Sequence, residues 1–534
     1  MGRSTNEVIG ARTAVPVRVG GHVEDDTLTV ACKYGEVRGY RDGDVYAWKG
    51  IPYAAPTGSR RFRSPLPPEP WDGVLDGARF GPIAPQSRQS PIGIDPEMTL
   101  SEDCLSLNIW APPPDGRRRP VMVWIHGGAY ILGYSGQKIY DGRILCESGD
   151  VVVVTINYRL GALGFLDLSS FSTPETTFES NVGLRDQIAA LEWVRDCIAD
   201  FGGDPDCVTL FGESSGAGSI TTLMTVPKAE GLFHRAIAQS PPATSVYGSE
   251  RAATVAQRFL EILDLPPSRA AELLTMSTDR LVEASEVLVA ETPTKVPGTL
   301  AMTPVVDRDL VPKYPVAAFQ KGLSHRIPLI IGSNKDEPSI FRFMKSPLMP
   351  VNDTAVQAMF AALADDRTDL PPERLAEIVA AYPDLPKAAG AMALSRDAGF
   401  RMPVLWVAEA HSAHSPTWVY RFDHATPMLK AARIGAGHAT ELPYVFGHFG
   451  TLGRDPTFWL GGRKAAGEVS GRVQRRWLAF AHHGVPAALD GSKHWPQYEV
   501  EERSTLLIDS TDRVESDPDG EMRRVWGSQV MAFT

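Results

Sequence analysis

The chain has 534 residues, of which 43% are hydrophobic and 22% charged, and its mean hydropathy is −0.14. These values are typical of a globular protein with enough apolar side chains for a large core. The net charge is −11 and the pI about 5.6. Such a balance argues against nucleic acid as a partner, because phosphate binding needs a clustered positive surface.

The first stretch, residues 1–26, is polar and unpatterned, and we expect a flexible extension there. It contains no apolar run of signal-peptide length, and the chain has no run of the roughly 18 apolar residues that a membrane span requires. The five cysteines are odd in number and lack CxxC spacing, which indicates small buried thiols rather than disulfides or a zinc site. We therefore expect a cytoplasmic protein with no membrane partner.

Strand and helix patterns begin after this stretch. Residues 27–40 alternate apolar and polar side chains, which predicts an antiparallel pair of strands. The apolar runs at 119–128 and 150–159 predict strands buried on both faces. Apolar residues at three- and four-residue intervals predict an amphipathic helix over 181–201. Further elements of both kinds are predicted, namely buried strands at 207–214, 234–240, 326–337 and 417–424 and a helix at 252–264.

Strands that alternate with helices predict an α/β fold, with a large, mostly parallel central sheet and helices on both faces. The chain has no internal repeats and no low-complexity linker, so we expect a single catalytic domain over residues 27–534. Within it, residues 341–403 are rich in helix-forming residues and contain several prolines. We expect this stretch to be a helical insertion that covers one end of the sheet, over the active site.

The pentapeptide GESSG, residues 212–216, lies between a predicted strand and a predicted helix and is the chain's one GxSxG motif. A sharp strand-to-helix turn of this kind holds a serine hydroxyl clear of the backbone. Gly212 and Gly216 remove side chains where the turn would clash. Ser214 is therefore the candidate nucleophile. The alternative is a turn needed for packing alone, in which the serine has no chemical role.

The stretch HGGAY, residues 126–130, follows another predicted strand and offers donors for a negatively charged oxygen. Gly127 and Gly128 let the backbone approach a substrate closely, and the amide of Ser215, at the start of a helix, adds a third donor. The alternative is a glycine-rich loop required only for the turn. His126 is expected to brace this loop rather than to act as a base.

A serine nucleophile needs a base within hydrogen-bonding reach. The chain has 12 histidines. His438 stands out because it lies in a glycine-rich loop after a buried strand. His424, at the end of that strand, is its main rival.

The base in turn needs an acid that orients it, and three carboxylates are candidates. Glu337 closes a predicted strand, so its side chain is expected at the carboxyl edge of the sheet. Asp336 and Asp423 are the alternatives. The order Ser214, Glu337, His438 is the Ser…acid…His order of α/β-hydrolases.

Eight stretches in this order carry a resemblance to one family: WKGIPYAAP (48–56), SEDCLSLNIW (101–110), WIHGGAY (124–130), INYRLGALGF (156–165), FGGDPDCVTLFGESSGAGS (201–219), AIAQS (236–240), GSNKDE (332–337) and GHATELPYVFG (437–447). Together they resemble the type-B carboxylesterases, which include cholinesterases and bacterial para-nitrobenzyl esterases, and are closest in character to the latter. The resemblance implies an α/β-hydrolase fold and serine-esterase activity.

The resemblance also implies roles for individual residues. It implies a catalytic triad and an oxyanion hole from the residues already singled out: Ser214, Glu337 and His438 for the triad, and Gly127, Gly128 and Ser215 for the hole. Glu213 matches a family glutamate near the acyl and leaving-group pocket, and Ser240 matches a buried serine that supports the triad. Two structural ion pairs are implied as well, Arg61 with Glu102 and Arg159 with Asp186.

The chain departs from the family pattern at several positions. Ala84 stands where the partner of Cys104 is expected, so Cys104 should be a free thiol, which agrees with a reducing compartment. Ser215 replaces the usual alanine after the nucleophile. Pro338 follows the acid in place of glycine, and a proline is expected to restrict Glu337 to extended conformations.

These inferences predict a serine carboxylic-ester hydrolase that acts through an acyl-enzyme on small or medium uncharged esters. No metal and no organic cofactor is implied, and we expect a monomer or a homodimer whose partner is a small-molecule ester. Two alternatives stay open. One is a biosynthetic enzyme of the same fold that transfers or cyclises an acyl group, or cleaves carbamates or amides. The other is a non-catalytic binding module, against which the intact Ser214 and His438 argue.

Overall fold

A computed structural model describes residues 27–89, 93–449, 455–488 and 494–534. The extension expected over residues 1–26 lies outside the described residues. None of the helices in the described ranges combines the length and the apolar character that a bilayer crossing requires.

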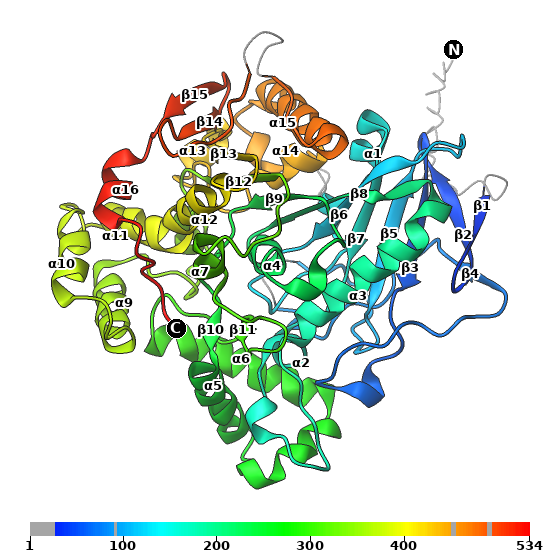
Figure 1. The fold of residues 1–534 in the computed structure, drawn as a ribbon, viewed down its shortest axis with the longest axis horizontal. Helices are drawn as coiled ribbons and strands as arrows, with labels where there is room; N and C mark the ends of the chain where they lie inside the picture. Colours follow the sequence, from blue (N-terminus) through cyan, green and yellow to red (C-terminus); the bar gives the residue numbers. More distant parts are fainter. Residues whose placement is uncertain (1–26, 90–92, 450–454, 489–493) are drawn as a thin grey trace, which may run out of the picture.

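One large sheet runs through the molecule (Figure 1). Its strands lie in the order β1-β2-β3-β5-β7-β6-β8-β9-β12-β13-β14-β15, and β4 pairs with β2. The strands from β7 to β14 in this order are parallel, and antiparallel strands flank them at both edges. The bounds are β1 Thr27–Cys32, β2 Gly35–Asp42, β3 Val45–Pro52, β4 Val74–Asp76, β5 Ser106–Ala111, β6 Arg119–Ile125, β7 Val152–Ile156, β8 Gly203–Glu213, β9 Arg235–Gln239, β12 Leu329–Asn334, β13 Thr417–Phe422, β14 Ser504–Ile508 and β15 Arg513–Ser516.

Helices cover both faces of this sheet. Along each buried strand, successive side chains point to opposite faces of the sheet. In β6, Val121 and Val123 belong to the larger hydrophobic core, whereas Met122 and Trp124 belong to a second core on the opposite face. The larger core includes side chains of α3, α4, α5, α6 and α9, and the second includes α1, α14 and α15. The predicted α/β fold with two covered faces is therefore confirmed.

The helices have the following bounds: α1 Arg143–Gly149, α2 Gly161–Phe165, α3 Val182–Cys197, α4 Ser215–Leu223, α5 Ser249–Ile262, α6 Thr278–Lys295, α7 Pro315–Gln320, α8 Pro338–Phe343, α9 Asp353–Asp366, α10 Pro372–Ala380, α11 Ala388–Arg396, α12 Met402–Ser412, α13 Pro427–Ala431, α14 Leu442–Phe446, α15 Arg463–His483 and α16 Gly520–Trp526. The α-helix predicted over 181–201 ends at Cys197 and continues as a 3₁₀ turn to Phe201. The stretch 341–403 is helical, as predicted, and spans the end of α8 to the start of α12. That residues 27–534 form a single domain stays a prediction.

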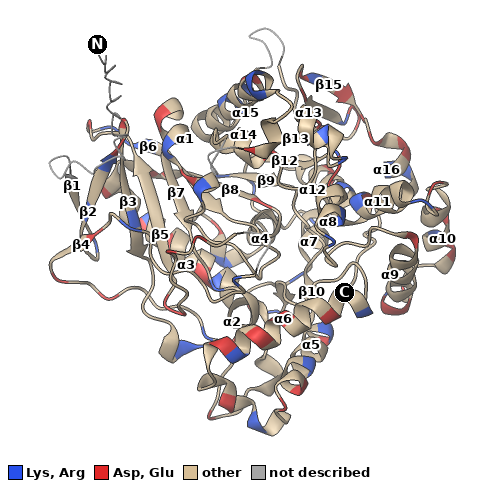
Figure 2. Cartoon of the chain, turned by 180° about the vertical axis from the view of Figure 1, so that it is seen from behind, with Lys and Arg blue, Asp and Glu red and all other residues tan. Residues whose placement is uncertain are grey.

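Both ion pairs implied by the resemblance are present. Arg159 donates to Asp186 at 2.5 and 2.8 Å, with both side chains buried, and this pair ties the loop after β7 to α3. Arg61 Nε donates to Glu102 Oε2 at 2.7 Å. Cys104 is a fully buried free thiol. Acidic and basic side chains are interspersed over the helices and loops (Figure 2).

Candidate active site

Ser214 lies at the turn between β8 and α4, as the GESSG motif predicts. Its backbone has φ 55° and ψ −128°, a conformation that side chains rarely adopt. The turn is tight enough that a Cβ on Gly216 would come within 2.1 Å of the Ile125 carbonyl oxygen. Since no side chain fits at that distance, glycine is required for α4 to begin directly behind the serine.

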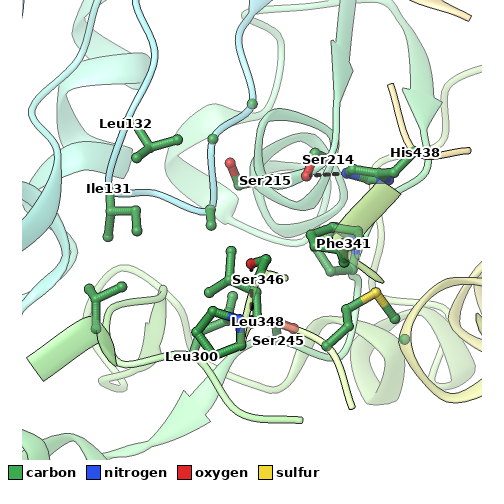
Figure 3. A pocket seen from close by; sticks show the side chains of 18 of the residues that line it. Ile131, Leu132, Ser214, Ser215, Ser245, Leu300, Phe341, Ser346, Leu348 and His438 are labelled. Atoms are coloured by element: carbon green, nitrogen blue, oxygen red, sulfur yellow. Dashed lines mark hydrogen bonds between the residues drawn. The ribbon is translucent and has the colours of Figure 1, made fainter. Parts of the chain in front are cut away.

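A hydrogen-bonded chain joins Ser214 to a histidine and a glutamate from distant parts of the sequence. His438 Nε2 lies 2.8 Å from Ser214 Oγ, and His438 Nδ1 lies 2.6 Å from Glu337 Oε2 (Figure 3). With Nδ1–H donating to the carboxylate, Nε2 is left to accept the proton of the serine hydroxyl. The three side chains thus have the geometry of a nucleophile, a base and an orienting acid.

Glu337 differs from the expectation in two respects. It lies three residues beyond the end of β12, and its φ of −39° and ψ of −52° are helical rather than extended. The reason is that Pro338 occupies the first position of α8, where proline fits a helix. The carboxylate is fixed by its contacts, since Oε1 accepts hydrogen bonds from the Asn334 N–H at 2.7 Å and from Ser240 Oγ at 2.6 Å. These contacts outweigh the local bias against a helical residue before proline.

The alternative acids and the alternative base lie elsewhere. Asp336 accepts a hydrogen bond from a backbone N–H of the loop that precedes the candidate base. Asp423 pairs with Arg421 at 2.7 Å. His424 Nδ1 lies 3.4 Å from Oδ1 of Asp509, the residue directly after β14. Their contacts account for these residues without a part in the serine's chain of hydrogen bonds.

The glycine loop after β6 faces the serine turn. A Cβ on Gly127 would meet Ser214 Cβ at 3.0 Å, and Gly128 has a φ of 122°, where a Cβ would lie 2.0 Å from a backbone oxygen. The N–H groups of both glycines donate no hydrogen bond within the described residues. The Ser215 N–H heads α4, so the positive end of the helix dipole adds to it. His126 Nδ1 contacts the Gly127 carbonyl at 2.8 Å, and its ring stacks on Tyr158, which fits the expected bracing role.

Two further carboxyl groups are buried around His438. Glu213 Oε1 lies 3.1 Å from His438 Nε2 without hydrogen-bond alignment, so the interaction is electrostatic. Burial raises the pKa of Glu213 to about 8, although the positive charge of His438 acts to lower it. Burial by itself lowers the pKa of His438, but the carboxylates of Glu213 and Glu337 outweigh it and raise this pKa to about 9. The surroundings therefore favour the imidazolium, the form that a base reaches during acyl transfer.

Sequence reasoning missed several residues of this cluster. Asn334 Nδ2 donates to Glu441 Oε2 at 2.5 Å and to the Gly437 carbonyl at 2.7 Å, which holds the histidine loop against β12. Both Asn334 and Glu441 lie inside stretches that carry the family resemblance, so a signal was present. The ring of Phe400 lies 4.7 Å from that of His438, on a π-helical turn between α11 and α12 that has no sequence signal.

A cavity of about 660 Å³ opens beside the serine. This volume is in the usual range for small-molecule sites. Figure 3 shows Ser214 and His438 on one side of it and Ser245, Leu300 and Leu348 on the opposite side. Its lining is mostly apolar, and no lysine or arginine occurs among the described residues that line it.

A strained serine turn, a buried His–Glu pair and a glycine loop at the carboxyl ends of parallel strands are typical of a hydrolase of the α/β class. The sequence profile of the carboxylesterase family matches residues 26–526. The chain therefore belongs to the carboxylesterase family.

Individual relatives agree. The chain is 38% identical to the para-nitrobenzyl esterase of Bacillus subtilis (strain 168) over 501 residues, covering 93% of this chain and 97% of that one. It is 35% identical to the fumonisin B1 esterase of Sphingopyxis macrogoltabida, covering 92% and 88%. A solved PNB esterase superposes with a TM-score of 0.84 at 36% identity, covering 94% and 99%.

These findings make the chain a carboxylesterase, a serine ester hydrolase with the α/β-hydrolase fold. They do not favour an acyl-transfer, carbamate- or amide-cleaving enzyme, or a binding module.

Proposed function

We propose that Ser214 is the nucleophile, His438 the general base and Glu337 the residue that holds its tautomer. Ser214 Oγ forms a bond to the ester carbonyl carbon while its proton passes to His438 Nε2. The amides of Gly127, Gly128 and Ser215 stabilise the oxygen that becomes negative. The carbon–oxygen bond to the alcohol then breaks, and His438 returns the proton to the leaving alcohol, which leaves an acyl-enzyme.

Hydrolysis repeats these steps with water. His438 removes a proton from water, the oxygen bonds to the acyl carbon, and the bond to Ser214 breaks as the serine recovers its proton. Ser240 keeps Glu337 in place through the 2.6 Å hydrogen bond to its carboxylate. Glu213 adds negative potential beside Nε2 when it is ionised. The observation that carries the proposal is the continuous path from Ser214 through His438 to Glu337 at 2.8 and 2.6 Å.

The substrates proposed are small or medium uncharged esters. Support comes from the apolar lining and from the lack of lysine and arginine among the described lining residues, because an anionic group would be desolvated there without a partner. The names of the relatives, para-nitrobenzyl esterase and fumonisin B1 esterase, also point to esters as the substrate class.

A cytoplasmic location and a monomeric or homodimeric state complete the proposal. All five cysteines are free thiols, which suits a reducing compartment. Cell fractionation with immunodetection tests the location, and finding the protein in an oxidising compartment would contradict it. Light scattering of the purified enzyme tests the oligomeric state, and a tetramer or larger assembly would contradict it.

Replacing the nucleophile tests the catalytic proposal. We expect Ser214→Ala to lower kcat/KM for para-nitrophenyl butyrate by about four orders of magnitude, because the covalent step is lost. The far-UV circular dichroism and the unfolding midpoint should stay close to those of the wild type. Ser170→Ala, on an exposed serine, is the matched control and should keep full activity. Activity of Ser214→Ala within tenfold of wild type would contradict the proposal.

A further inference from the structure

The segment after α16, residues 527–534, contributes to the wall of the active-site cavity. Met531, Ala532 and Phe533 line this cavity together with Ser214 and His438, although they lie about a hundred residues or more from either in sequence. In Figure 1 the segment runs back from α16 and ends beside α5, α6 and the short strand β10 (Tyr247–Gly248). The cavity wall is thus closed by a short stretch that belongs to no helix or strand.

Burial alternates along this segment. Met531 and Phe533 are buried, at 4% and 8% exposure, whereas Val530 and Ala532 are partly exposed. Met531 and Phe533 are the two large apolar residues that this segment contributes to the cavity lining. The backbone oxygens of Val530 and Ala532 bond to a side chain that does not line the cavity.

An arginine on the outer side holds these backbone oxygens. Arg367 Nη1 donates to the Ala532 carbonyl at 2.8 Å and to the Val530 carbonyl at 3.2 Å. The guanidinium is itself fixed by Asp369 at 2.7 Å. The segment is therefore fastened at two carbonyls that flank Met531.

A second fastening lies at the end of the segment. The Thr534 N–H donates to Asp366 Oδ2 at 2.8 Å, and Arg251 bridges Asp366 Oδ1 at 2.6 Å and the Thr534 backbone oxygen at 3.1 Å. The Arg251 guanidinium also stacks 4.9 Å from the ring of Phe533. Charged groups thus secure the end of the segment, and one of them also packs on the Phe533 ring, whereas none of these charged groups lines the cavity.

The neighbouring walls of this part of the cavity are apolar too. The apolar residues that line it from α6 and α9 include Leu281, Val289, Met359, Phe360 and Leu363. Among the lining residues of these two helices, Glu286 is the charged one, and it is exposed. An apolar chain is therefore the ligand group that this region suits, since burying it costs no hydrogen bond.

We propose that Met531 and Phe533 form an end wall that sets how long an apolar chain the ester can carry. The proposal rests on the proposed function, because it concerns the substrate of the same serine. The chain belongs to either the acyl or the alcohol part of the ester, and the test treats the two separately. One methylene in an apolar pocket changes kcat/KM by about tenfold or more, so a change in wall volume is readily measured.

The test compares wall variants on two ester series, para-nitrophenyl alkanoates from acetate to dodecanoate and alkyl acetates from ethyl to decyl. Met531→Trp fills the end, and we expect the kcat/KM ratio of long to short esters to fall about tenfold in one series. Met531→Ala opens the end and should raise the same ratio about tenfold. Met522→Ala, on α16 and outside the cavity lining, is the matched control and should leave the ratio unchanged.

The outer fastening gives a second test. Arg367→Ala removes the hydrogen-bond donor of two carbonyls of the segment. The kcat/KM ratio of long to short esters should therefore rise, as expected for Met531→Ala. Arg513→Ala, an arginine on β15 in an exposed ion pair with Glu515, is its control. Ratios within twofold of wild type in both series for both Met531 variants would overturn the proposal. No hydrolysis of any ester by the unaltered enzyme would count against the proposed function instead.

Discussion

Among single residues, backbone strain is concentrated around Ser214, the proposed nucleophile. Five non-glycine residues with positive φ belong to the site's turns and loops: Ala129, Tyr130, Ser214, Ser240 and Ala439. Each such conformation costs on the order of 1–3 kcal/mol and persists only where the surroundings enforce it. The enforcing contacts include the bond from the Ser214 N–H to the Gln239 carbonyl at 2.9 Å. The strained backbone aims the hydroxyl at His438.

The pH dependence of activity tests the charge arrangement at the same scale. The Glu213 carboxylate raises the pKa of His438, so removing its charge should lower this pKa. The unprotonated base then predominates from a lower pH, and the acid limb of the kcat/KM profile of Glu213→Gln should move to lower pH. A profile measured from pH 5 to 10 on para-nitrophenyl acetate checks this. A limb that stays in place or moves to higher pH would contradict the charge arrangement.

Single residues also show how far sequence reasoning reaches. The GESSG and HGGAY motifs are short, contiguous patterns, so Ser214 and Gly127 could be singled out from the sequence, although the atoms that require Gly216 and Gly127 to lack a side chain belong to the other motif's strand or turn. The conformation of Glu337 was predicted wrongly. A residue before proline is biased away from helical conformations. In Glu337 the hydrogen bonds that Ser240 and Asn334 donate to the carboxylate outweigh this bias. The contact with Ser240 joins residues 97 apart in the chain, so the sequence around Glu337 does not reveal it.

At the scale of elements, the site depends on how closely α4 follows β8. We expect Gly216→Ala to abolish esterase activity or to prevent folding, because its Cβ would collide with the Ile125 carbonyl oxygen, which cannot move out of the sheet. Gly467→Ala is the matched control. Gly467 is exposed in α15 with no atom within 4 Å of the added Cβ. This change should keep activity and raise stability by about 0.5–1 kcal/mol. Full activity in Gly216→Ala would contradict the tight turn.

The junction of α3 with the loop after β7 gives a stability prediction. Arg159→Met removes the cation that neutralises Asp186 in a fully buried position. Leaving one partner of such a pair unmatched costs about 3–5 kcal/mol, so the urea unfolding midpoint should fall clearly. Arg269→Ala, in an exposed pair with Glu272, is the control and should leave the midpoint unchanged. Equal midpoints for the two variants would contradict a structural role for the buried pair.

Elements were predictable to different degrees. Of the parallel strands, β6, β7, β8, β9, β12 and β13 were predicted, because both of their faces are buried and their sequences contain continuous apolar runs, whereas β14 was not predicted. The helical character of 341–403 was also evident from composition. The π-helical turn that brings Phe400 onto His438 was not, because it depends on how α11 and α12 are joined rather than on a periodic pattern.

At the scale of the whole molecule, the cavity is assembled from widely separated parts of the chain. Its lining includes Pro85 and Gln86 near one end of the sequence and Phe533 near the other. Sequence patterns pointed to the proposed nucleophile, base and acid but not to this part of the wall, since the segment 527–534 has neither a motif nor a period. We therefore expect substrate size to depend on tertiary packing that no local motif reveals.

The central claim is that one hydroxyl, that of Ser214, becomes acylated. The most direct measurement is stoichiometric labelling with a fluorophosphonate probe, followed by mass spectrometry of the intact chain and of its peptides. We expect one adduct per chain, located on Ser214, with esterase activity lost in proportion to labelling, and no adduct on Ser214→Ala. An adduct on another residue, or full inhibition with Ser214 unlabelled, would contradict it.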